Sequence, residues 1–161
     1  HDIADYKLHE GDESLGPKIS KCWLEELNLD KQSINKIVKA IPKLSFKGAN
    51  TKIQKLSLEE KCAQDADRLD AMGAIGIARC FTFGGFKRNM IHDPTIISRK
   101  DISEKEYKKI NGTSINHFYE KLLLLKDRLN TETAREIAES RHIFLEKFLE
   151  QFFFLLVVRT I

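Results

Sequence analysis

The chain has 161 residues, the size of one domain, and its 42% hydrophobic and 32% charged residues are the balance of a globular protein. Its longest apolar run, residues 152–158, is far shorter than the roughly 20 residues that a helix needs to cross a bilayer. The formal net charge of +3 is mild and does not by itself indicate nucleic acid as a partner. We therefore expect one domain with a hydrophobic core and no membrane partner.

Three cysteines, Cys22, Cys62 and Cys80, are too few for a disulfide framework, and their number is odd. None of them has the spacing of a metal ligand. No basic and apolar leader with a cleavage site opens the sequence, so no secretory signal is expected within it. We predict reduced thiols in a cytoplasmic protein.

The first third of the chain predicts two amphipathic helices. The Gly-Pro pair at residues 16–17 is typical of a helix start, and the apolar residues at 17–27 recur at a spacing of four. Asp30 is a predicted N-cap of a second helix, which we expect to end at Pro42. Residues 42–56 then follow as a loop.

The middle of the chain predicts one long helix and a long irregular segment. Ser57 and Glu60 have the spacing of a capping box, which predicts a helix to about Phe81, broken by Gly84 and Gly85. The polar stretch that follows, up to Thr113, has no clear periodicity. Irregular segments of this length are often functional lids or connections.

The last third predicts two more helices. Ser114 is the predicted cap of a helix to about residue 129, and Thr131 that of a helix over 132–158. No segment favours a strand, so the predicted fold class is all-α. We expect the apolar tail from Phe152 to be core, with a homodimer surface as the alternative. The side chains expected to face inward from the last helix are Ile137, Ile143, Phe144, Phe148, Leu149 and Phe152.

Seven lysines and no acidic residue lie between residues 31 and 58. This segment is either a solvated helix face and loop or a field that attracts a polyanionic substrate. Nucleic acid is a weak candidate, because Phe46 is the only aromatic residue there on which a base could stack. The lysines are Lys31, Lys36, Lys39, Lys43, Lys47, Lys52 and Lys55.

Chemistry-bearing residues first gather in the opening segment, residues 1–5. If this segment is helical, His1 and Asp5 are four residues apart and Asp2 and Asp5 three apart. An imidazole and two carboxylates would then share one side of the helix.

The second group lies in residues 65–70, inside the long predicted helix. Helical spacing puts Asp67 and Asp70 on one face and directs Asp65 elsewhere. Carboxylates among apolar neighbours need a cation or hydrogen bonds, and the alternative is a solvated face that is salt-bridged with Arg68. Imidazole and carboxylate ligands suit manganese, iron, cobalt or nickel, with magnesium possible at sites rich in oxygen.

Two glycines close to that group suggest tight packing. Gly73 and Gly76 in mid-helix would each cost about 1 kcal/mol relative to Ala. We therefore expect another element to pack very close to the helix there.

The motifs His1-Asp2 and Asp67-Arg68-Leu69 resemble two of the three segments of the HD-domain phosphohydrolases. The resemblance extends to a branch of small HD proteins that are similar to bacterial nucleotide pyrophosphohydrolases. Its stretches here are residues 1–13, 64–79 and 117–142, of which the middle one is the most specific.

The resemblance implies a compact helical HD-domain bundle and a metal-dependent phosphohydrolase. His1, Asp2 and Asp67 would be ligands of a divalent metal ion, with manganese expected first, and Asp5 would assist proton transfer. The substrate would be a nucleotide, with pyrophosphate released from a (deoxy)nucleoside triphosphate or phosphate from a nucleoside monophosphate. A nucleotide-binding module without turnover and a structural bundle without a site are the rival functions. The implied substrate contacts are Lys7, His117 and Lys121.

One element of the HD pattern is missing from the sequence. The first histidine of the pattern belongs to an upstream helix, so we expect residues 1–161 to be a single HD domain without its N-terminal segment. Without that ligand, metal affinity and activity of the chain as given would be reduced. His92-Asp93 repeats the dipeptide, but Pro94 follows at once, which favours coincidence.

Overall fold

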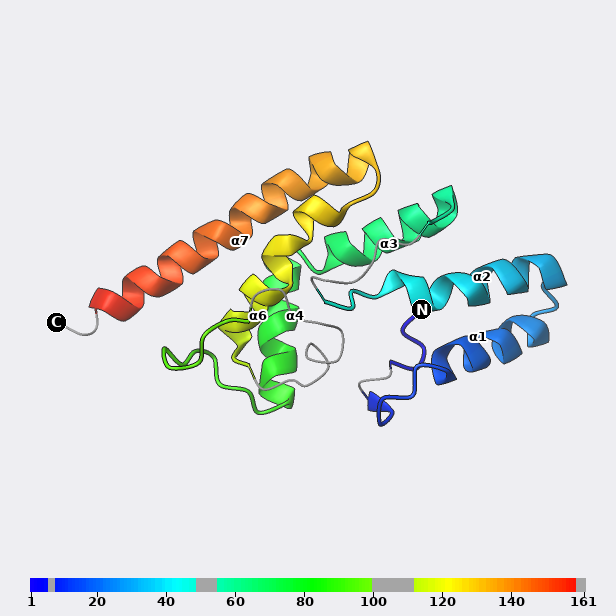
Figure 1. The fold of residues 1–161 in the computed structure, drawn as a ribbon, viewed down its shortest axis with the longest axis horizontal. Helices are drawn as coiled ribbons and strands as arrows, with labels where there is room; N and C mark the ends of the chain where they lie inside the picture. Colours follow the sequence, from blue (N-terminus) through cyan, green and yellow to red (C-terminus); the bar gives the residue numbers. More distant parts are fainter. Residues whose placement is uncertain (6–7, 49–54, 100–111, 159–161) are drawn as a thin grey trace. The chain divides into compact units, whose positions relative to one another are not determined.

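The computed structural model describes residues 1–5, 8–48, 55–99 and 112–158 (Figure 1). In these ranges the chain forms α-helices and two short 3-10 helices and no strand, which confirms the all-α prediction. The chain divides into two compact units. The first unit consists of His1–Ser45 and Gln54–Gln64, and the second of Phe46–Ile53 and Asp65–Ile161. That the chain is a single HD domain stays a prediction.

Two antiparallel helices, α1 (Leu15–Glu26) and α2 (Lys31–Leu44), make up most of the first unit and pack side by side (Figure 1). The Asp30 side chain accepts a hydrogen bond from the Ser33 amide at 2.9 Å, which confirms the predicted N-cap. The predicted end of α2 is wrong, because the helix continues through Pro42. Proline in the last turn removes only one backbone hydrogen bond, so the helix tolerates it.

The core of the first unit is small. The stripe predicted on α1 does not face a core, since Trp23 and Leu27 are each 53% exposed and Ile19 is 38% exposed. Ile37 on α2 is exposed as well. The buried apolar side chains described in this unit are Ala4, Leu24, Ile34 and Leu44.

The start of α3 (Leu58–Asp70) belongs to the first unit. Ser57 and Glu60 exchange hydrogen bonds at 2.9 and 3.3 Å, so the predicted capping box is confirmed. Glu60 also forms an ion pair with Lys43, and the Gln64 side chain donates to the Lys43 carbonyl at 2.6 Å. These contacts join the end of α2 to the first two turns of α3.

The single long helix predicted from residue 57 to 81 is wrong, because the chain turns between α3 and α4 (Gly73–Phe86). At the turn, Gly73 has φ +68°, a conformation that favours glycine. A Cβ at Gly73 would lie 3.2 Å from the Arg141 Cγ, and the Arg141 guanidinium donates to the Leu69 carbonyl at 2.6 Å. The turn therefore packs directly on α7, as the glycine pattern indicates.

Two other glycines of α4, Gly76 and Gly84, lie where a side chain would meet a close neighbour. A Cβ at Gly76 would collide with the Ala71 carbonyl, and one at Gly84 with the Ser114 hydroxyl. Gly84 and Gly85 lie inside α4, so the prediction that they end the helix is wrong. Gly84 thus allows α4 to approach the start of α6 closely.

The helix predicted over 114–129 is divided into three pieces, namely α6 (Ser114–Glu120), η2 (Leu122–Leu124) and η3 (Lys126–Arg128). Its cap is Thr113, one residue earlier than predicted, whose hydroxyl accepts from the Asn116 amide at 3.1 Å. At Lys121 the backbone leaves the helical region, with φ −141°. The chain then continues in 3-10 turns, and leucines of this stretch are buried in the core.

The described part of the polar stretch, residues 87–99, is attached to α6. Arg99 donates to the carboxylate of the buried Glu120 through its backbone N–H at 3.0 Å and its guanidinium at 2.8–2.9 Å. Asn116 donates to the Ile96 carbonyl at 3.0 Å. This segment is therefore held by buried polar contacts.

The long helix α7 (Glu132–Val158) confirms the prediction, with Thr131 as its cap. Three residues expected to face inward, Ile137, Ile143 and Phe144, are 41–49% exposed, so that part of the prediction is wrong. Phe148 does pack in the core, stacked on Phe118 at 5.4 Å between ring centroids. Among the described helices, none, α7 included, has the length and apolar character that crossing a membrane requires.

Candidate metal and substrate site

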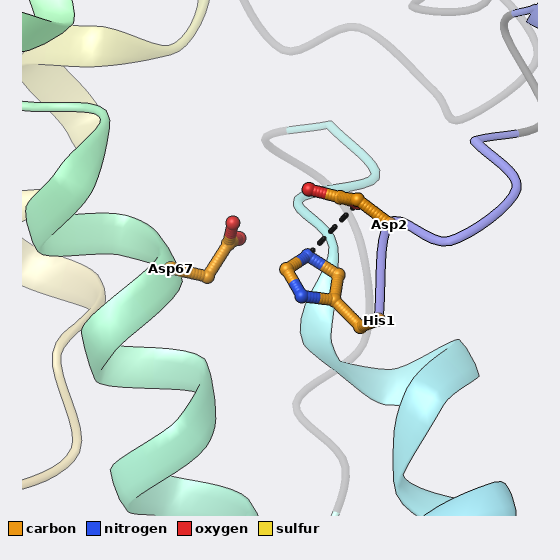
Figure 2. A group of neighbouring side chains, drawn as sticks. All are labelled: His1, Asp2 and Asp67. Atoms are coloured by element: carbon orange, nitrogen blue, oxygen red, sulfur yellow. Dashed lines mark ion pairs between the residues drawn. The ribbon is translucent and has the colours of Figure 1, made fainter. Parts of the chain in front are cut away.

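The opening segment, residues 1–5, forms a turn rather than the helix on which the spacing argument depended. His1 and Asp2 nevertheless meet, with the His1 Nε2 atom 3.1 Å from the Asp2 carboxylate (Figure 2). The segment lies against the first turn of α1, where a Cβ at Gly16 would be 3.4 Å from the Ala4 carbonyl. Gly16 and the buried Ala4 thus hold the segment in place.

The His1 side chain is 21% exposed and that of Asp2 57%, so both reach water. Asp5, three residues after Asp2, is half-buried. An imidazole nitrogen and a carboxylate oxygen so close together are the kinds of atoms that bind a transition-metal ion.

Asp65 is the most buried of the three aspartates on α3, and its role is structural. Its Oδ1 atom accepts hydrogen bonds at 2.8 Å from the backbone and side-chain amides of Asn130, and its Oδ2 atom accepts them at 2.8 Å from the amide and hydroxyl of Thr131. Desolvation raises the pKa of Asp65, but these hydrogen bonds outweigh it, so the pKa lies below its ordinary value. Asp65 therefore fixes the start of α7, a role that helical spacing alone does not indicate.

The remaining aspartates of the group differ from Asp65 and from each other. Asp70 is exposed and forms an ion pair with Arg79. Asp67 is half-buried and is drawn with the His1–Asp2 pair in Figure 2. Arg68 donates to the Arg128 carbonyl, so it braces the second unit. Burial lowers the pKa of Arg68, as the nearby Arg128 does, while Asp65 and Asp67 raise it.

Of the predicted substrate contacts, Lys7 lies outside the described residues. His117 is half-buried in α6, and Lys121 follows that helix one turn later, its amide bonded to the His117 carbonyl at 3.0 Å. The Lys121 ammonium lies 5.9 Å from the centroid of the Phe46 ring. The structure thus places His117 and Lys121 together in the second unit.

His92 has a different environment. Its ring meets those of Phe152 and Phe153 edge-on, at 5.9 and 5.3 Å between centroids. Asp93 is occupied in a turn, where it accepts from the amide and hydroxyl of Thr95 at 2.8 and 2.7 Å. The second His-Asp pair is therefore part of a packed loop.

No protein-family model matches the sequence. The chain is 35% identical over 154 residues to YpgQ of Bacillus subtilis, which is 94% of this chain and 66% of that protein. A solved structure from Lactobacillus plantarum is 40% identical, with a TM-score of 0.78 over 84% of this chain and 64% of the other. The chain therefore spans about two thirds of the length of these relatives.

Two further structures bear on the family. An HD-superfamily hydrolase from Bacillus thuringiensis is 42% identical, with a TM-score of 0.64 over 95% of this chain and 67% of that one. YpgQ in complex with ADP is 33% identical, with a TM-score of 0.63 over 84% of this chain and 61% of that one. With this degree of identity over an all-α fold, the chain belongs to the HD superfamily of hydrolases.

Proposed function

We propose that the protein containing this chain is a metal-dependent phosphohydrolase that acts on a nucleotide, and that His1, Asp2 and Asp67 bind its metal ion. One imidazole and two carboxylates form a donor set that suits manganese or a similar divalent ion. The contact between His1 and Asp2 supports this assignment, because it presents two donors of the right kind side by side.

The contact between His1 and Asp2 carries the proposal, and the third ligand comes from the aspartates on α3. Asp65 and Asp70 are engaged with Asn130, Thr131 and Arg79 in the second unit. The resemblance implies that Asp67, which is half-buried, is the metal ligand of this helix.

The bound metal ion would supply a water of lowered pKa and a polarised phosphoryl oxygen. Asp5 accepts the proton of the attacking water or donates one to the leaving oxygen, for which a half-buried carboxylate three residues after Asp2 is suited. Lys7, His117 and Lys121 contact the substrate and offset the negative charge of the phosphoryl group. The ADP complex of YpgQ supports a nucleotide as the substrate class.

We further propose that the substrate is a (deoxy)nucleoside triphosphate, attacked at the α-phosphorus with release of pyrophosphate. The test is made on the full-length protein that contains this chain. Metal content is measured by elemental analysis, and products are identified after incubation with manganese and a panel of nucleoside mono- and triphosphates. Asp67→Asn is compared with Asp70→Asn, which makes the same change one turn further along α3.

We expect about one metal ion per wild-type chain and pyrophosphate as the product. Asp67→Asn should lose the metal and about 100-fold or more of the activity, since one ligand is removed, whereas Asp70→Asn should stay within about twofold of wild type. Full metal content in Asp67→Asn would rule out this ligand. Nucleotide binding without turnover would leave a binding module, and phosphate released from monophosphates would identify a phosphatase.

A further inference from the structure

The segment that follows α4 runs along α6 and contacts it first at its start. The Ser114 amide, the first of α6, donates to the Met90 carbonyl at 3.0 Å. The Ile115 amide donates to the Ile91 carbonyl at 3.0 Å as well. The first amides of a helix have no partner within the helix, so these bonds satisfy groups that α6 itself leaves open. We call residues 87–99 the strap.

The strap also holds the end of α6. Arg99 donates to the Glu120 carboxylate through its backbone N–H at 3.0 Å and its guanidinium at 2.8–2.9 Å. Glu120 is the last residue of α6 and is 4% exposed. A carboxylate at this end of a helix opposes the helix dipole, and its burial removes water, so a cation is needed to stabilise it. The planar guanidinium bonds both carboxylate oxygens and thereby fixes the orientation of the two side chains.

The geometry of α6 depends on contacts of this kind. The helix has seven residues, fewer than the roughly 12–15 that an isolated helix needs to be marginally stable. Immediately after Glu120 the backbone leaves the helical region, with φ −141° at Lys121. The pair of Arg99 and Glu120 therefore lies at the point where the direction of the chain after α6 is set.

The predicted substrate contacts lie on a different side of α6 from the strap. Asn116, which donates to the Ile96 carbonyl at 3.0 Å, and Glu120 are four residues apart and share the face toward the strap. His117 is the next residue after Asn116 and is therefore rotated by about 100° around the helix. The Lys121 amide is bonded to the His117 carbonyl at 3.0 Å. The strap can thus hold α6 without occupying the side on which His117 lies.

We propose that Glu120 is a positioning residue which, held by Arg99, fixes the end of α6 and so the directions of His117 and Lys121. This inference rests on the proposed function, in which those two residues contact the substrate. All the contacts that carry it belong to the second unit, so they do not depend on the first. It implies that loss of the pair raises the KM for the nucleotide and leaves the metal site intact.

The test uses the full-length protein with manganese and the nucleotide of the panel that is hydrolysed fastest. Arg99→Met, which removes the charge and the donors, is compared with Arg99→Lys, which retains the charge and one donor group. Ala138→Gly is the control. Ala138 is fully buried in α7, so glycine there weakens a different helix of the same unit.

We expect the KM to rise about tenfold or more in Arg99→Met and about threefold or less in Arg99→Lys, because lysine keeps part of the contact. The kcat and the metal content should change little in both variants. In Ala138→Gly the KM should stay within about twofold of wild type, even where its thermal unfolding midpoint falls as far as that of Arg99→Met. A loss of stability alone reduces the amount of active protein, and hence the apparent kcat, without a change in KM.

A second measurement does not depend on activity. In protein labelled with carbon-13 in its histidines, the ring signals of His117 are assigned by their loss in His117→Gln and are then compared among the variants by NMR. We expect these signals to shift or broaden in Arg99→Met and to stay close to those of wild type in Arg99→Lys. They should be unchanged in Ala138→Gly.

Arg99→Met alone leaves the Glu120 carboxylate buried without this cation and can prevent folding. In that case the double variant Arg99→Met/Glu120→Met is used, because replacing both members of a buried ion pair by apolar side chains often costs little stability. The directed bond is lost in this variant as well. The KM should therefore rise about tenfold or more, and the His117 signals should move.

Two results would overturn the inference. Unchanged KM and unchanged His117 signals in Arg99→Met or the double variant would refute it and leave the proposed function standing. An equal rise of the KM in Ala138→Gly would refute it too, since the effect would then follow stability rather than the ion pair. If the wild-type protein binds no metal and hydrolyses no nucleotide, the proposed function fails, while the His117 signals still decide whether Glu120 positions that residue.

Discussion

The two units of the chain differ in how much core they contain. In the described residues, the first unit buries four apolar side chains, whereas the second buries a cluster of twelve with aromatic rings stacked at its centre. Burial of apolar surface is the main source of stability, so we expect the first unit to be less stable than the second.

This difference is expected to have its largest effect on local opening. Native-state hydrogen exchange should show the amides in the middle of α7, around Ala138 and Leu145, protected at least about 100-fold more than those of α1 around Trp23. Exchange is measured residue by residue by NMR. Equal protection in the two helices would mean that both units open together, and would contradict the expected difference in stability between them.

A smaller effect is expected from the two neighbouring aspartates of α3. Asp65→Ala leaves the partly buried amides of Asn130 and Thr131 without an acceptor and should reduce the free energy of unfolding by about 3 kcal/mol. Asp67→Ala, in protein treated with a chelator, should reduce it by less than about 1 kcal/mol. The free energy of unfolding of each variant is measured by urea denaturation. Similar losses in the two variants would contradict the assignment of Asp65 as a structural carboxylate and of Asp67 as a metal ligand.

The smallest effect concerns the cysteines, which are free thiols in both units. Cys22 and Cys62 are exposed, whereas burial raises the pKa of Cys80 to about 11, against a smaller opposing effect of Lys121. At pH 8 only about one Cys80 in a thousand is then a thiolate. Iodoacetamide should modify Cys22 and Cys62 in the native protein and Cys80 only after denaturation, as peptide mass spectrometry would show.

Predictions from local sequence signals are confirmed where a single side chain determines the start of a helix. The cap at Asp30, the capping box at Ser57 and the cap at Thr131 are all present, because each depends on hydrogen bonds within four residues. The helical class follows from the same signals. The candidate site residues came from the resemblance and stay a prediction, while the shared helix face expected of residues 1–5 is not present.

The remaining errors have long-range causes. The turn at Gly73 depends on Arg141, and the division of the helix after α6 depends on the burial of leucines such as Leu122 and Leu125. Asp65 bonds residues 65 positions further along the chain. Periodicity contains no information on such contacts, so they became visible only in the fold.

The turn at Gly73 has a consequence for how such a chain can vary. A positive φ alone would admit asparagine, but a Cβ would also approach the Arg141 side chain to 3.2 Å. A substitution at Gly73 therefore meets two independent constraints, and a small shift of the Arg141 side chain relieves only the contact. We expect homologous sequences to retain glycine at this position even where the residue that corresponds to Arg141 varies.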